Sequence, residues 1–105
     1  MPTQRQIERF TLAFHREALK RLRAEPRLRA QAAAVLDRWE AQGVTEHAKV
    51  YRDRWRALLG GDFTELEAAV CAETDEAATL RSMSPLGFTL AQDERLKLRQ
   101  EAMAE

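Results

Sequence analysis

The chain has 105 residues, 45% of them hydrophobic and 32% charged, with 17 basic and 17 acidic side chains and a formal net charge of zero. This length fits one domain with one modest core, and the apolar content excludes a disordered tail. Ala32 to Leu36, among the longest apolar runs, is far shorter than the roughly 20 residues that span a bilayer. We see no signal peptide, and the single cysteine, Cys71, excludes an internal disulfide, so we expect a cytoplasmic protein.

The first predicted helix begins with a capping box at Thr3 and Gln6 and runs to about Ala24, because Pro26 ends it. Apolar side chains recur on one face of this helix and are expected in the core: Ile7, Phe10, Phe14, Ala18 and Leu22. Leu12 and Leu19 widen that face, which predicts either a larger core or a contact between two copies of the chain. Pro26 suits the first turn of a second helix, and Gly43 is typical of its end.

Four further helical segments follow in the sequence. Thr45 is expected to cap a helix that ends at Gly60-Gly61, and Asp62 with Glu65 predicts a capping box for a helix over 62–72. Thr74 restarts a helix over 74–83, unless the two short helices run together, and the residues 84–87 break it. A third capping box, Thr89 with Gln92, opens a final helix whose tail is expected to fray from about residue 100. No segment alternates like a strand, so residues 1–105 predict a single all-α domain, a compact bundle of five or six short helices.

Charge is distributed unevenly along the sequence. Residues 1–30 carry eight basic and three acidic side chains, whereas residues 60–94 carry eight acidic side chains and one basic side chain, Arg81. Five basic residues form a stripe on the first helix opposite its apolar face and are candidates for binding nucleic acid: Arg5, Arg9, Arg16, Lys20 and Arg23. The same stripe is also what an ordinary solvent-exposed helix face contains. Uneven charge of this kind indicates partners rather than a fold.

No group of residues predicts catalysis. His15 and His47 have no neighbours at the spacing of a metal motif, and the sequence has neither a phosphate-binding glycine loop nor a nucleophile elbow. We therefore expect a protein that is not an enzyme and that has no cofactor and no metal.

Three short motifs distinguish the second half of the chain: Trp55-Arg56-Ala57-Leu58-Leu59, then Leu80-Arg81-Ser82-Met83-Ser84-Pro85, then Glu94-Arg95. Over about 40 residues they resemble a group of short all-helical bacterial proteins that are often encoded beside a nucleotidyltransferase-like toxin. That group usually has phenylalanine directly after the proline, where this chain has Leu86, with Phe88 two residues later. The resemblance implies an antitoxin-like protein that neutralises a partner.

These observations lead to three functional hypotheses. The first is a protein-interaction module that binds a nucleotidyltransferase-like protein through an acidic segment and a turn that holds Leu86 and Phe88 outward, with these contact residues: Glu73, Asp75, Glu76, Arg81, Ser84, Pro85, Leu86 and Phe88. The second is a nucleic-acid-binding regulator that uses the basic stripe. The third is a homodimer with Leu12 and Leu19 in the contact.

Overall fold

The computed structural model describes residues 1–43 and 45–104, and every regular element in these ranges is helical. In chain order the elements are α1 (Gln4–Ala24), α2 (Leu28–Ala41), α3 (Glu46–Leu59), α4 (Phe63–Cys71), α5 (Asp75–Ser82), the 3-10 helix η1 (Gly87–Thr89) and α6 (Gln92–Met103). The Cα radius of gyration is 13.6 Å, close to the roughly 13 Å of a compact domain of this size. The predicted all-α bundle is confirmed.

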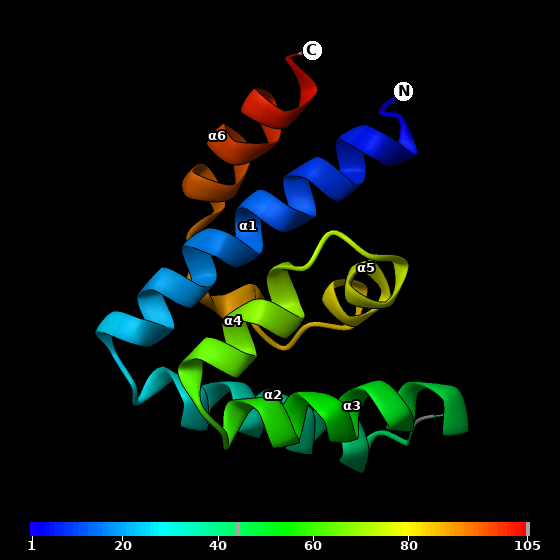
Figure 1. The fold of residues 1–105 in the computed structure, drawn as a ribbon, viewed down its shortest axis with the longest axis vertical. Coiled ribbons are helices and arrows are strands. Elements are labelled where there is room, and N and C mark those ends of the chain that lie inside the picture. Colours follow the sequence, from blue (N-terminus) through cyan, green and yellow to red (C-terminus); the bar gives the residue numbers. More distant parts are fainter. Residues whose placement is uncertain (44, 105) are drawn as a thin grey trace.

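The long helix α1 organises the bundle, because it packs against α2, α4, α5 and α6. Figure 1 shows α6 running back along α1, so that the two chain ends lie near each other. The helices α2 and α3 pack together below them, and α4 lies between this pair and α1. As a result, the basic N-terminal helix directly contacts the acidic α4 and α5.

Several predicted helix boundaries are confirmed by their hydrogen bonds. The Gln6 N–H donates to Thr3 Oγ1 at 3.1 Å and the Thr3 N–H donates to Gln6 Oε1 at 2.9 Å, which completes the capping box. Thr45 and Thr74 cap α3 and α5 through their hydroxyl oxygens. Gly43 has a φ of +83°, the left-handed conformation that favours glycine after a helix.

Three helix starts differ from the prediction. The second helix begins at Leu28, because Pro26 lies in a turn in which the Arg29 N–H donates to the Pro26 carbonyl oxygen at 3.1 Å. Asp62 precedes α4 as predicted, but its side chain forms no capping hydrogen bond. Thr89 does not cap α6, because its hydroxyl group donates to the Leu86 carbonyl oxygen at 2.7 Å and thereby closes η1. The N-cap of α6 is Ala91, and the helix continues to Met103, past the residue where we expected fraying.

The buried face of α1 is rotated from the predicted one. Its buried residues are Phe14, His15, Ala18, Leu19 and Leu22, whereas Ile7 is 43% exposed. A helix that packs against four neighbours buries a wider arc than a single stripe. Leu19 therefore lies fully inside the core of this chain, as the larger-core alternative predicted, and has no exposed surface for a contact between two copies.

Candidate functional site

The three predicted acidic contact residues lie together at the start of α5. Glu73 belongs to the connection between α4 and α5, and Asp75 and Glu76 form the first turn of the helix. All three are exposed, and within residues 1–43 and 45–104 none of them forms an ion pair. Negative charge is favourable at a helix N-terminus, so these side chains stabilise α5 while their carboxylates face solvent.

A cleft of about 300 Å³ separates this acidic end of α5 from the N-terminal half of α1, and we call it the α1–α5 cleft. Side chains of both signs line it, among them Arg5, Glu8, Arg9, Glu73, Asp75 and Arg81. One guanidinium group reaches α6, because Arg9 donates from Nη1 to the Ala102 carbonyl oxygen at 3.2 Å. The cleft is therefore lined both by the basic segment 1–30 and by the acidic segment 60–94.

The rest of the basic stripe is also close to other groups of the chain. Arg16 and Lys20 share a hollow with Glu67, and Lys20 pairs with Glu17 at 3.1 Å. The guanidinium of Arg23 lies 5.6 Å from the centre of the Phe63 ring, which is cation–π geometry. Two hollows, the α1–α5 cleft and the hollow of Arg16 and Lys20, therefore place basic residues of α1 beside acidic residues of the segment 60–94.

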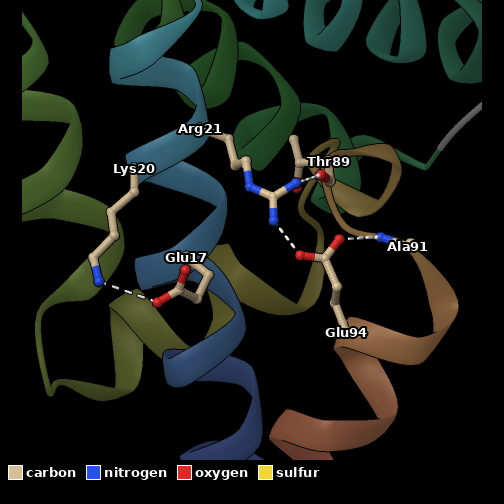
Figure 2. A network of polar contacts seen from close by, with 6 residues as sticks. All are labelled: Glu17, Lys20, Arg21, Thr89, Ala91 and Glu94. Atoms are coloured by element: carbon tan, nitrogen blue, oxygen red, sulfur yellow. Dashed lines mark hydrogen bonds and ion pairs between the residues drawn. The ribbon is translucent and has the colours of Figure 1, made fainter.

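Figure 2 shows how α1 is joined to the start of α6. Arg21 donates to the Glu94 carboxylate and, at 3.4 Å, to the Thr89 carbonyl oxygen, while Lys20 turns away to Glu17. Glu94 also accepts the Ala91 N–H at 3.0 Å. This backbone hydrogen bond, followed by the Arg21 contact, lowers the pKa of Glu94. The Glu94 part of the Glu94-Arg95 motif thus has a structural role at a helix start.

The sequence predicted that the turn over residues 84–88 holds Leu86 outward, but the centre of this turn faces the core. Pro85 and Leu86 are buried, and Leu86 has no exposed surface, because it packs into the core beside η1. Ser84 Oγ accepts the Leu86 N–H at 3.1 Å and fixes the turn. The prediction of Leu86 as an outward apolar anchor is wrong. Phe88, by contrast, is 40% exposed and is available for contact.

Arg81 is buried, with only 5% of its surface exposed. Its Nη1 donates to the carbonyl oxygens of Val70 and Ala72 at 2.7 and 2.8 Å, where α4 ends. These carbonyl groups have no partner within the helix, so the guanidinium group satisfies them and connects α5 to α4. Arg81 is thus a structural residue first, although part of it lines the α1–α5 cleft.

His15 is the most deeply buried polar side chain of α1 and was missed as a site residue. It is 2% exposed, and its ring packs 5.3 Å from that of Phe14 and 6.3 Å from that of Trp55, centre to centre. Nδ1 lies 2.7 Å from the Thr11 carbonyl oxygen, so Nδ1 carries the hydrogen and donates it. Burial, with a smaller contribution from the charge of Arg81, lowers the pKa of His15 to about 4, against the raising effect of the Thr11 bond. The imidazole is therefore neutral at neutral pH.

A second hollow, of about 230 Å³, opens beside His15, and we call it the His15 pocket. Its wall includes Phe10, Phe14, His15, Arg81, Ser84 and Arg95. The guanidinium of Arg95 lies 5.3 Å from the centre of the Phe14 ring and donates to the Gly87 carbonyl oxygen. Because Arg81 lines both hollows, the His15 pocket adjoins the α1–α5 cleft.

His15 Nε2 has no hydrogen-bond partner among the described residues, so no serine of the wall is activated by it. An imidazole with a pKa of about 4 is also a weak base. What the wall offers is positive charge, hydroxyl groups and aromatic faces.

A signal for His15 was present in the sequence. Residues 15, 19 and 22 are spaced so that they share one face of a helix. The face that places Leu19 and Leu22 in the core therefore places His15 there as well. Arg95 had no such signal, because its contacts with Phe14 and Gly87 come from residues distant in the sequence or across a turn.

Within residues 1–43 and 45–104, no group of three or more potential metal ligands occurs, and no helix is both long and apolar enough to cross a bilayer. Burial raises the pKa of the Cys71 thiol, which disfavours the reactive thiolate. Comparisons with protein-family models, curated proteins and solved structures find no match for this chain.

Proposed function

We propose that this chain is a non-enzymatic protein-interaction module whose contact surface is the start of α5 together with the α1–α5 cleft. The observation that carries the proposal is that Glu73, Asp75 and Glu76 are exposed and form no ion pair with the described residues, although Arg5 lines the same cleft. Three carboxylates in this arrangement suit a partner with a basic surface.

The sequence resemblance gives this partner a candidate identity, a nucleotidyltransferase-like toxin. An enzyme of that kind that acts on RNA needs a basic cleft, and the acidic start of α5 would cover such a cleft through complementary charge. Phe88 supplies one exposed aromatic side chain of the kind that anchors interfaces. Leu86 has no part in this proposal.

Replacement of Glu73, Asp75 and Glu76 by lysine should weaken capture of the partner by the tagged chain about tenfold or more, because attraction becomes repulsion. Capture from a host extract, followed by mass spectrometry and titration of the captured protein, measures the effect. A matched control replaces three exposed acidic residues elsewhere by lysine: Glu46, Asp53 and Glu65. Equal affinities for the two triple variants, with intact helical content in both, would remove the acidic surface from the proposal.

The nucleic-acid hypothesis has less support from the geometry. Arg5 and Arg9 face Glu73 and Asp75, and Lys20 pairs with Glu17, so carboxylates lie beside the basic stripe. Phosphate binding by such a stripe weakens steeply as salt rises. A gel shift at low salt that is lost on Arg16→Gln would establish this function instead.

A further inference from the structure

The His15 pocket has two positive charges and no negative one. Arg81 and Arg95 both line it, and none of the described residues in its wall is acidic. Four other hollows that arginine or lysine residues line each include a glutamate. A guanidinium group has five N–H donors, and the contacts with carbonyl oxygens engage Nη1 of Arg81 and Nη2 of Arg95. Of these five hollows, the His15 pocket is therefore the one whose wall has positive charge and no carboxylate, and its Arg81 also lines the α1–α5 cleft with Glu73 and Asp75.

Buried polar atoms without partners mark the same wall. Among the described residues, five buried polar atoms have no hydrogen-bond partner: His15 Nε2, Arg81 Nε and Arg95 Nε in this wall, and Arg52 Nε and Nη1 outside it. Buried polar atoms in proteins are nearly always hydrogen-bonded, and each exception needs a reason. Both Nε–H groups are themselves buried, so a bound anion would be held by the charge of the two guanidinium groups and would reach the Nε–H groups only after a side-chain shift. An anion would also offset the charge of Arg81, which lowers the pKa of His15, so its binding should raise that pKa. At neutral pH the ring is neutral with its hydrogen on Nδ1, so Nε2 donates no hydrogen bond to the anion.

The walls and the size of the pocket select the class of anion. Phe10 and Phe14 supply aromatic surface, and Ser84, whose oxygen accepts the Leu86 N–H, keeps its own hydroxyl hydrogen to donate. A volume of about 230 Å³ lies below the range of roughly 300–1,000 Å³ that holds drug-sized ligands. Arginine binds carboxylates through two parallel hydrogen bonds. We propose that the His15 pocket binds a small organic carboxylate whose charged end meets Arg81 and Arg95 and whose apolar body packs on Phe10 and Phe14.

The site needs no protein partner, so it can be tested on the isolated full chain. The probe is phenylacetate, titrated into ¹⁵N-labelled protein while NMR follows the imidazole of His15 and the Nε–H of Arg95. We expect a saturable change of both signals and a rise in the pKa of His15. Phenylacetamide, which has the same shape without the charge, should bind about tenfold or more weakly, and so should inorganic phosphate, which lacks the apolar body.

Variants on α6 separate a specific site from general attraction of anions. Arg95→Gln should weaken phenylacetate binding about tenfold or more, whereas Arg99→Gln, the same change at an exposed position outside the pocket, should leave binding unchanged. Arg95→Lys keeps the charge without the planar fork and should bind with intermediate affinity, which provides a test if Arg95→Gln does not fold. Equal effects of Arg95→Gln and Arg99→Gln, or phosphate or the amide binding as tightly as phenylacetate, or no saturation at millimolar concentrations, would overturn the proposal.

Discussion

Leu86→Ala should lower the free energy of unfolding by about 2–5 kcal/mol, the usual cost of truncating a fully buried leucine. Leu86 has no exposed surface and belongs to the same core cluster as Trp55 and Leu80, so the shorter side chain leaves a cavity in the core. Urea denaturation followed by circular dichroism measures the change. A domain of this size has little stability to spare, so the variant should be partly unfolded under mild conditions.

Phe88→Ala is the matched control, two residues further along the chain. Because Phe88 is 40% exposed, its truncation should cost about 1 kcal/mol or less. The two variants together test the orientation of the turn over residues 84–88. If Phe88→Ala were the more destabilising of the two, the turn would have the outward Leu86 that the sequence first suggested, and the core described above would be wrong.

Acid should destabilise the protein through His15 before the carboxylates titrate. The pKa of His15 is about 4 in the folded protein and 6.5 in the unfolded chain, so the unfolded chain binds more protons between these values. The stabilisation is present above pH 6.5 and is lost as the pH falls towards 4. Between about pH 7 and about pH 5 the loss should amount to about 2 kcal/mol.

His15→Gln removes the titrating group, and its stability should be nearly independent of pH over that interval. The measurement is a set of urea denaturations of both proteins at several pH values. The two proteins are compared by the slope of the free energy of unfolding against pH, because the substitution itself changes the free energy of unfolding at every pH. If the free energy of unfolding changed with pH by the same slope in the wild-type protein and in His15→Gln, His15 would have the same pKa in the folded and unfolded states. It would then not be buried as a neutral ring.

The helices were predictable because local rules determine where they begin and end. The Thr3–Gln6 capping box, the threonine caps and the left-handed Gly43 each depend on a few neighbouring residues. The exceptions involve competition between local options. Thr89 has the right type for an N-cap, but its hydroxyl group donates to the Leu86 carbonyl oxygen, and the Glu94 carboxylate accepts the N–H of Ala91, the residue that precedes α6 as its N-cap.

The candidate site was only partly predictable, because most of it is created by contacts between distant segments. The exposure of Glu73, Asp75 and Glu76 could be predicted from their charge alone, without knowledge of how the helices pack. The burial of Leu86 depends on which helices surround it, and the His15 pocket depends on α1 meeting residues 81–95. Charge pairing across the bundle, such as Arg21 with Glu94, likewise cannot be read from charge along the chain.

Site-specific photocrosslinking tests the proposed contact surface most directly. A photoreactive amino acid in place of Glu76, in the chain bound to its captured partner, should form a covalent link to that partner, and the same residue in place of Asp53 on α3 should form none. Efficient crosslinking from position 53 and none from position 76 would contradict the proposal that the start of α5 faces the partner.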